Sequence, residues 1–440
     1  MLKTSAKLNN RILFLILFLS ILPIIHIGSF SMPVLYLLIP IVTAILFLIT
    51  YRHIKQFGWA SIPKVVKLIT FLFLLIIVEI FISSILSAVT TLDKFIFPTD
   101  TIQYVARFIF FIGFIYFFYK GKIEADTFIK YFLIFLSAAM LIGILQWIPW
   151  PGRELFIKLY PYRTGLEQLE RLGLPLHQLR VHGIAQIATA NGGLATLFFI
   201  FGFSVFKYYK KYNILSVSLM VLSLVNVFAS QARAGLLALL FSLILFYIIS
   251  IIMNGNIYKK TLYLVYSVVM GIVIFVFLYL IKNPFVEHMV YRWEVLVETG
   301  GGPRVDQMKY FFSMLEHPFH YLFGLSKQVI NQSEFSYGVE VEPINIFITY
   351  GAFGFMIQYT LVAVLLIYFF KAIGKSIENK AALTLIVASF VGLFSYQIFS
   401  IAYFFFREIR IGLFPWILMG VAIGVYERYK IKENEFGLKE

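Results

Sequence analysis

Residues 68–91 read LITFLFLLIIVEIFISSILSAVTT, an apolar run whose one charged side chain is Glu79. About 20 apolar residues in a helix are enough to cross the hydrocarbon core of a bilayer. The run therefore predicts a membrane-spanning helix. Similar runs follow one another along the chain, separated by charged residues, glycine or proline. They predict twelve spans, at residues 11–28, 33–50, 68–91, 102–119, 130–149, 183–206, 213–230, 234–252, 261–281, 343–370, 381–401 and 409–426.

The composition is typical of a membrane protein. Hydrophobic residues make up 60% of the 440 residues and charged residues 13%, about half the charged share of an ordinary globular chain. A soluble protein of this length cannot bury so much apolar surface. We expect an all-α polytopic membrane protein, with about twelve transmembrane helices in a single integral membrane domain over residues 1–440. The chain has no cysteine, which excludes disulfides, thiolate catalysis and cysteine metal sites.

The basic residues predict the orientation of the chain, because short cytoplasmic loops carry an excess of lysine and arginine. If both termini are cytoplasmic, 22 of the 37 basic residues lie in cytoplasmic segments. The two longest polar segments, 150–182 and 282–342, are then extracytoplasmic, and we expect short amphipathic helices in them. The net charge of +15 indicates this topology and contact with anionic membrane lipids. It gives no support to nucleic-acid binding.

The basic residues outside differ in kind from those inside. Nineteen of the 22 cytoplasmic ones are lysines, whereas ten of the 15 outer ones are arginines. The planar guanidinium group suits bidentate binding of phosphate or carboxylate. We therefore expect outer arginines to bind a lipid-linked phosphate or pyrophosphate; the alternative is that they pair with outer acidic residues. The ten are Arg107, Arg153, Arg163, Arg171, Arg180, Arg233, Arg292, Arg304, Arg407 and Arg410.

Four of these arginines are the candidates for a pyrophosphate site. Arg233 lies in the turn SQARAG at 230–235, at the membrane boundary, where an arginine is costly unless it is paired or solvated; an interface anchor is the alternative reading. Arg304 follows three glycines and a proline at a predicted helix start, where backbone N–H groups favour an anion. Arg180 and Arg292 are the supporting members of the set.

The first outer loop contains a leucine pattern. Leucines recur every three or four residues over 165–180, which predicts an amphipathic segment in the outer membrane interface. Gly173 and Pro175 are expected to break or kink it.

Glu79 is the other unusual residue, because a carboxyl group inside a membrane is costly. It is either a proton or cation site or a buried hydrogen bond between helices, and we favour the hydrogen bond. Its candidate partners are His26, Asn191 and Asn226.

Four different short motifs lie between residues 180 and 360. They are the 230–235 turn, His182-Gly183 to Asn191-Gly192, Arg304 to His317-Pro318 to Phe323-Gly324, and Glu340-x-Glu342 to Tyr350-Gly351-x-x-Gly354. Together with the twelve spans, they resemble the O-antigen polymerase and O-antigen ligase superfamily. The resemblance implies an inverting, metal-independent glycosyltransferase without a cofactor, acting on undecaprenyl-pyrophosphate-linked glycans at the outer face of the bacterial cytoplasmic (inner) membrane. A chain-length regulator and a flippase are the implied protein partners.

One departure from the ligases favours a polymerase. Ligases of this superfamily resemble one another in a His-Asn pair after the large outer loop, and here that place reads Glu342-Pro343-Ile344-Asn345. A polymerase would join repeat units into O-antigen, capsular or exopolysaccharide chains, and the sequence leaves the sugars and the product open. The alternatives are a ligase-type glycan transferase and a lipid-linked glycan transporter or flippase. The two halves of the chain are unequal and its mid-chain cytoplasmic loop is short. Both features disfavour a transporter.

Breaking a sugar–pyrophosphate bond needs two chemical functions. Arginines can stabilise the charge that develops on the pyrophosphate, and a carboxylate or imidazole must accept the proton of the acceptor hydroxyl. For the proton acceptor we expect Glu342 first and Glu340 second, with His317 as the rival and His320 as a further candidate. The alternative for Glu342 is to pair with Arg292 or Arg304. The sequence has no clustered acidic motif for a metal ion.

Overall fold

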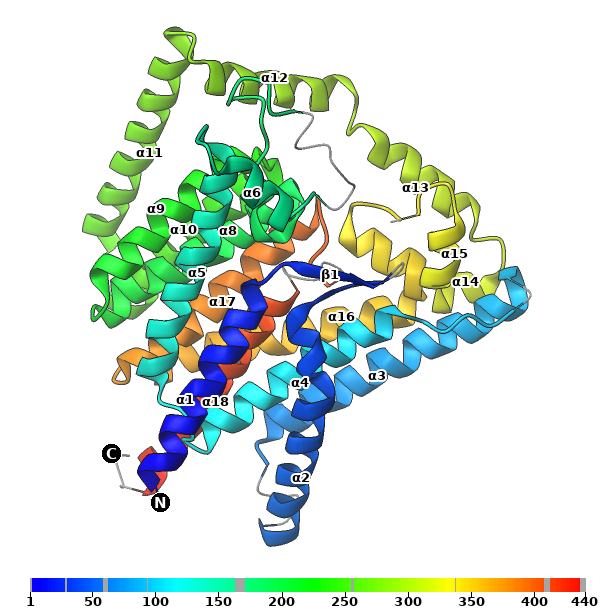
Figure 1. Cartoon of the computed structure of the whole chain (residues 1–440), viewed down its shortest axis with the longest axis vertical. Helices are drawn as coiled ribbons and strands as arrows, with labels where there is room; N and C mark the ends of the chain where they lie inside the picture. The colour runs from blue at the N-terminus through cyan, green and yellow to red at the C-terminus, as the bar shows by residue number, and fades with distance from the viewer. Residues whose placement is uncertain are drawn as a thin grey trace.

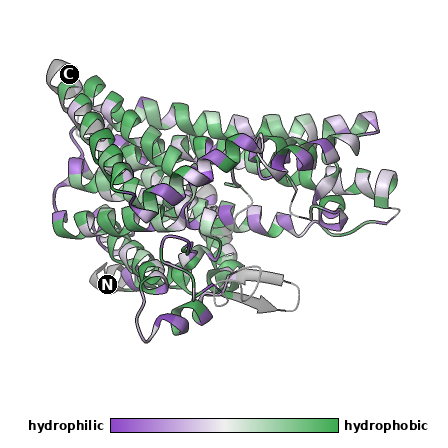
Figure 2. Ribbon diagram, turned by 90° about the horizontal axis from the view of Figure 1, so that it is seen from above, coloured by the Kyte–Doolittle hydropathy of each residue, from purple (hydrophilic) through white to green (hydrophobic). Residues whose placement is uncertain are grey.

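The computed structural model describes residues 2–27, 30–57, 62–92, 94–162, 171–254, 257–336, 338–406 and 412–435. Within these ranges the chain forms a bundle of helices with one short two-stranded antiparallel sheet (Figure 1). Hydrophobic residues run along most of the length of the helices, and hydrophilic residues concentrate in connecting segments and at helix ends (Figure 2). The prediction of a helical, multi-pass membrane protein is confirmed.

The helices and strands follow one another along the chain, and the longest connection lies between α6 and α8. The first half contains α1 (Leu2–Ile21), β1 (Ile24–Ile27), β2 (Phe30–Pro33), α2 (Ile39–Phe57), α3 (Lys64–Ser87), α4 (Asp100–Tyr119), α5 (Ala125–Trp147), α6 (Arg153–Leu159), α8 (Ala188–Ser204) and α9 (Asn213–Ser230). The second half contains α10 (Arg233–Asn254), α11 (Ile257–Leu280), α12 (Pro284–Glu298), α13 (Pro303–Ser313), α14 (Pro318–Phe323), α15 (Ser326–Gln332), α16 (Glu342–Lys375), α17 (Lys380–Ser400) and α18 (Leu413–Glu435).

Eight of the described helices are long and apolar enough to cross a membrane. They are α3 with its extension to Leu92, α4, α5, α8 with its extension to Tyr209, α9, α10, α16 and α17, and each coincides with a predicted span. The other four predicted spans do not coincide with any of these eight helices. Two are shorter apolar helical segments, Leu8–Ile21 and Val34–Leu46; the third is α11, which bends by 98° into α12. The fourth is α18, which is apolar to Tyr426 and charged beyond it.

Close packing at small residues holds the centre of the bundle together. Lipid tails are as apolar as leucine, so helices in a membrane associate through close contact more than through hydrophobic attraction. A Cβ atom on Gly192 of α8 would lie 2.4 Å from the Cβ of Ala232, and one on Gly235 of α10 would lie 2.9 Å from the Gly192 carbonyl carbon. The backbones of α8 and α10 are therefore in direct contact, and this contact fixes the 230–235 turn.

A second close contact breaks α16. Gly351 has φ 66° and ψ −168° inside this helix, and a Cβ there would lie 2.2 Å from the carbonyl carbon of Leu322. Gly324, with φ 78°, likewise comes within 2.3 Å of the Thr349 carbonyl carbon when a Cβ is added. The end of α14 therefore packs into the break, which gives both glycines of the quoted motifs a packing role.

Gly351→Ala is expected to lower the thermal unfolding temperature by several degrees. A residue other than glycine in this backbone conformation costs about 1–3 kcal/mol, and the new methyl group would also overlap Leu322. Gly374→Ala in the same helix is the matched control, because nothing lies within 4 Å of a Cβ there; it should raise stability by up to about 1 kcal/mol. Equal unfolding temperatures for the two variants in detergent would show that the break does not need glycine.

The amphipathic segment predicted over 165–180 is not helical in the part that the structure describes, which contains the expected breakers Gly173 and Pro175. Residues 171–180 form successive turns, in which Leu174 N donates to Arg171 O at 3.0 Å and Gln178 N donates to Pro175 O at 2.9 Å. Within these turns Leu174 is exposed, whereas Leu179 is buried. Residues 163–170 lie outside the described residues.

The predicted asparagine partners of Glu79 are also wrong. Asn191 Nδ2 donates to Asn226 Oδ1 at 3.1 Å, so the two amides join α8 to α9. Glu79 is buried on α3 and faces α16, where a Cβ on Gly354 would lie 3.4 Å from its Cγ. The side chain of His26 lies outside the described part of the chain.

Candidate arginine site

Two arginines hold the turn that precedes α10. Arg180 Nε donates to Ser230 O at 3.2 Å, and Arg180 Nη2 donates to the Thr189 hydroxyl at 3.2 Å. Arg292 of α12 donates through Nη1 to both the backbone oxygen and the side-chain Oε1 of Gln231, each at 3.0 Å. Gln231 itself has a left-handed backbone with φ 50°, which turns its carbonyl towards α12. Arg180 and Arg292 therefore approach the same turn from different segments.

Arg233 joins the same group from the first residue of α10. Its Nη1 donates to the backbone oxygen of Arg292 at 2.6 Å, and its guanidinium carbon lies 5.9 Å from the ring centroid of Trp293. A guanidinium group over an indole face is favourable because of the charge distribution of the ring. The aromatic face and the backbone oxygen thus fix the direction of Arg233.

Arg304, in the first turn of α13, connects this group to the start of α16. Its Nη2 lies 2.9 Å from Glu340 Oε2 in an ion pair and donates to Ala402 O at 3.2 Å. Its Nε is buried and has no hydrogen-bond partner among the described residues. The backbone N–H of Glu340 in turn donates to Gln307 Oε1 at 3.3 Å. α13 and the segment before α16 therefore hold Arg304 and Glu340 against each other.

The four guanidinium groups lie close enough to act on one another. Burial, followed by the charges of Arg180 and Arg233, lowers the pKa of Arg292 to about 10. The group stays charged at neutral pH, so the cluster keeps its positive charges together. Like charges held this close repel one another, and an anion between them would relieve the repulsion. The arrangement is suited to binding a multivalent anion.

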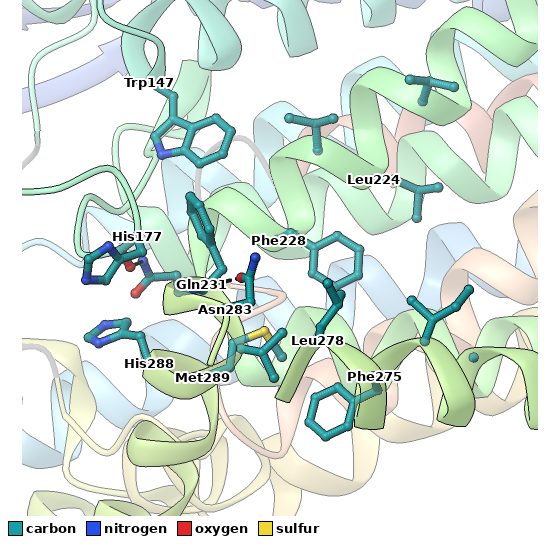
Figure 3. A pocket seen from close by; sticks show the side chains of 16 residues that line it. Trp147, His177, Leu224, Phe228, Gln231, Phe275, Leu278, Asn283, His288 and Met289 are labelled. Atoms are coloured by element: carbon teal, nitrogen blue, oxygen red, sulfur yellow. Dashed lines mark hydrogen bonds between the residues drawn. The ribbon is translucent and has the colours of Figure 1, made fainter. Parts of the chain in front are cut away.

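An apolar cavity of about 560 Å³ adjoins the arginines. Its walls come from α9 and α11, with Phe228, Phe275 and Leu278 among them (Figure 3). Its polar end is made by His177, Gln231, Asn283 and His288. Gln231 connects the cavity to the cluster, since its Nε2 donates to His177 O at 2.6 Å while its Oε1 accepts from Arg292.

The cavity lies beside a helix that stands away from the bundle. α11 is at the left in Figure 1 and most of its described side chains are exposed. At the polar end, the rings of His177 and His288 have centroids 5.9 Å apart. Burial, Arg292 and His177 lower the pKa of His288, so this imidazole is neutral at neutral pH. The cavity can therefore take an apolar chain whose charged end lies at the arginines.

Three of the four candidate proton acceptors, Glu340, Glu342 and His317, lie in different environments. Glu340 is half-buried and ion-paired with Arg304. Glu342 is only 1% exposed, and its Oε1 accepts a hydrogen bond from the backbone N–H of Phe406. His317 is exposed and is the N-cap of α14, where its Nδ1 accepts from Phe319 N at 3.3 Å. Glu340 thus contacts the arginine cluster directly through Arg304.

The length of α13 separates the histidines from the arginines. Eleven helical residues at 1.5 Å each extend about 16 Å between the start of α13 at Arg304 and the turn that leads to His317. His320 is buried next to His317, and its Nε2 lies 3.1 Å from the Thr90 hydroxyl. Both histidines thus have contacts that shape α14.

Not all ten of the predicted outer arginines belong to this site. Arg107 is fully buried on α4, where its Nη2 donates to Gln103 Oε1 at 3.1 Å. Arg153 is buried and its Nε donates to Gln146 O at 2.9 Å, which fixes α6 to α5. Arg171 is exposed on a turn. Three more lie outside the described residues: Arg163, Arg407 and Arg410.

Sequence reasoning missed the residues that shape the cluster between the arginines. Gln231 lies in the quoted turn, directly before Ala232 and Arg233, but its side chain has no charge and no motif to mark it. Trp293 follows Arg292 directly, and an aromatic residue next to an arginine is too common to predict a cation–π contact. The cavity joins helices that are separated in sequence, so no local pattern predicts it.

No protein-family model matches this chain, and no curated protein matches it either. An assignment of function therefore depends on the arginine cluster, on Glu340 and on the adjoining cavity.

Proposed function

We propose that this protein is a polysaccharide polymerase that joins undecaprenyl-pyrophosphate-linked oligosaccharide repeat units. The product would be an O-antigen, capsular or exopolysaccharide chain, made at the outer face of the bacterial cytoplasmic membrane. One observation carries the proposal: Arg180, Arg233, Arg292 and Arg304 come from separate segments and gather beside a carboxylate, next to an apolar cavity. A lipid-linked pyrophosphate has the same two parts, an apolar chain and a multivalent anion.

The donor lipid would bind with its pyrophosphate among the arginines and part of its chain in the cavity between α9 and α11. Guanidinium groups bind phosphate oxygens in pairs. The buried Nε of Arg304 would be one of the donors. Backbone and side-chain oxygens of the protein fix the directions of the arginines, and such preorganisation is the condition for stabilising charge at low reorganisation cost.

In the reaction, the acceptor hydroxyl oxygen attacks the anomeric carbon of the donor sugar. The new glycosidic C–O bond forms as the C–O bond to pyrophosphate breaks, so the sugar inverts and undecaprenyl pyrophosphate leaves with the electron pair. The arginines stabilise this leaving group and can contribute several kcal/mol. Glu340 would accept the proton of the acceptor hydroxyl. Arg304 would hold Glu340 in place, and the cationic cluster would take the role that a metal ion has in other phosphate sites.

The proposed topology has twelve spans with both termini in the cytoplasm and residues 150–182 and 282–342 outside. It counts α1, α2, α11 and α18 with the eight long apolar helices. The start of α1 and the end of α18 lie on one side of the bundle, at the lower left in Figure 1, which supports termini on the same face of the membrane. The lysine-rich connections indicate which face of the bundle is the cytoplasmic one.

Single cysteines test this topology without background, because the chain has none of its own. Gln178→Cys and Asn331→Cys replace exposed residues of the two proposed outer loops, and Glu378→Cys replaces an exposed residue between α16 and α17. An impermeant maleimide should label the first two in intact cells and the third only after the membrane is opened. Labelling of Glu378→Cys from outside would reverse the orientation.

Reconstitution with a synthetic undecaprenyl-pyrophosphate repeat unit tests the proposed reaction. A polymerase should produce a ladder of longer glycans and release undecaprenyl pyrophosphate. Transfer of a single unit to a lipid acceptor, with no ladder, would indicate a ligase-type transferase. Movement of the intact donor across the bilayer, with no new glycosidic bond, would indicate a flippase.

A further inference from the structure

A second groove lies at the end of α4 that carries Lys120, between α2, α3 and α4. Its volume is about 320 Å³. Apolar side chains of the three helices form most of its lining, with Leu46, Val66, Ile109, Ile112 and Ile115 among them. Polar groups gather at one end, where the lining residues are Lys67, Tyr116, Tyr119 and Lys120. The groove therefore has an apolar length and a cationic mouth.

The length of the groove matches one leaflet of a bilayer. Its lining residues on α4 run from Phe108 to Lys120, and at 1.5 Å per residue this distance is about 18 Å. The hydrocarbon core of a bilayer is about 30 Å thick, so one leaflet supplies about half of that. Tyr116 and Tyr119 at the mouth are residues that favour the level of the lipid headgroups. A single acyl chain can thus lie along the groove from its mouth.

The mouth is positively charged. Lys64 and Lys122 are exposed next to the lining lysines, and burial, together with the charge of Lys122, lowers the pKa of Lys120. Two acidic side chains at this end of the helices have basic partners: Glu124 lies 3.6 Å from Arg428, and Glu427 lies 3.0 Å from Lys430. An anion at the mouth would meet four lysines, Lys64, Lys67, Lys120 and Lys122.

We infer that this groove binds an anionic glycerophospholipid of the cytoplasmic leaflet, with one acyl chain against α3 and α4 and its phosphate at Lys67 and Lys120. The chemistry of the apolar walls and of the charged mouth determines which molecule fits the groove. The apolar walls require a hydrocarbon chain, and the lysines require a negative headgroup. The lysine-rich side of the bundle is the proposed cytoplasmic side, and the cytoplasmic leaflet is rich in anionic lipids. The inference does not depend on the glycan chemistry at the other site.

Native mass spectrometry of the full chain tests the inference with phosphatidylglycerol as the probe and phosphatidylethanolamine as the neutral reference. The wild type should retain phosphatidylglycerol at least about tenfold better, as expected for a pair of basic side chains near a membrane surface. The double variant Lys67→Gln/Lys120→Gln should lose this preference. The matched control Lys371→Gln/Lys375→Gln removes the same charge from two exposed lysines of α16 on the same proposed side, and it should keep the preference.

A variant of the wall tests the acyl chain separately from the charge. Ile112→Trp fills the groove and leaves every lysine in place, and it should also lose the retained phosphatidylglycerol. Glycerol phosphate, which has the headgroup without the chains, should not displace the lipid from the wild type. Unchanged retention in both the lysine double variant and Ile112→Trp would overturn the inference. So would an equal loss in the α16 control, because the effect would then come from net charge alone.

Discussion

Arg304→Lys should reduce chain elongation by a reconstituted protein at least about 10²-fold, the loss seen when one well-placed donor to a developing oxyanion is removed. The guanidinium group of Arg304 reaches Glu340 and Ala402 O through one nitrogen and has a further buried N–H at Nε. A lysine is a single point charge and cannot occupy these directions together. The charge is conserved, so the loss would identify the geometry of the fork as the property that the site needs.

Two further arginine variants show whether the loss is specific to the cluster. Arg233→Lys should also fail, since the ammonium group cannot both lie over Trp293 as a flat cation and donate to Arg292 O. Arg171→Lys is the matched control, because Arg171 is an exposed arginine of residues 150–182, the first proposed outer loop, and elongation should stay within about twofold. The rate is read from glycan ladders at saturating donor. Normal ladders from both Arg304→Lys and Arg233→Lys would show that the pyrophosphate assignment is wrong.

The sequence predicted the membrane class and the types of residue in the site better than the contacts between them. Apolar runs such as 68–91 identify spans because the bilayer imposes a length that side chains alone reveal. The four arginines could be selected because arginine is unexpected outside, where topology disfavours positive charge. Arg107 meets the same criterion but is buried on α4, where it contacts Gln103. The position of an arginine in the sequence does not tell how deeply its side chain is buried, because burial depends on helix packing.

The wrong predictions share a physical reason. A leucine every three or four residues is compatible with a helix or with successive turns, and Gly173 and Pro175 favour the turns that residues 171–180 adopt. The sequence alone offers several possible hydrogen-bond partners for the amides of Asn191 and Asn226. The close approach of α8 and α9 leaves each amide within reach of the other at 3.1 Å. Tertiary packing makes that choice, and no local pattern expresses it.

The structure also separates two glutamates that the sequence ranked in the other order. Glu342 begins α16, but it is 1% exposed and accepts the backbone N–H of Phe406. That contact holds the segment whose Ala402 O meets Arg304. Glu340 comes two residues earlier, is half-buried and touches Arg304 directly. We therefore expect Glu340 to be the proton acceptor and Glu342 to position the segment around Arg304.

Glu340→Gln is expected to lower elongation about 10²-fold or more, because an amide keeps the size of the side chain but cannot accept the hydroxyl proton. Binding of the lipid donor, measured separately, should stay near the wild-type level, since the four arginines remain. Glu342→Gln is the matched variant. Its amide oxygen can still accept from Phe406 N, so both elongation and thermal stability should stay within a few-fold and a few degrees of the wild type.

The opposite pair of results would reverse the assignment. If Glu342→Gln stops elongation while its unfolding temperature is unchanged, and Glu340→Gln elongates normally, the buried carboxylate accepts the proton and the segment around it must open during turnover. If both variants elongate normally, neither carboxylate is the base, and His317 and His320 become the remaining candidates. That outcome would require α14 to approach the arginines from the far end of α13, about 16 Å away. A base at that distance implies a closing movement of the outer helices, which cross-linking of α13 to α10 would then block.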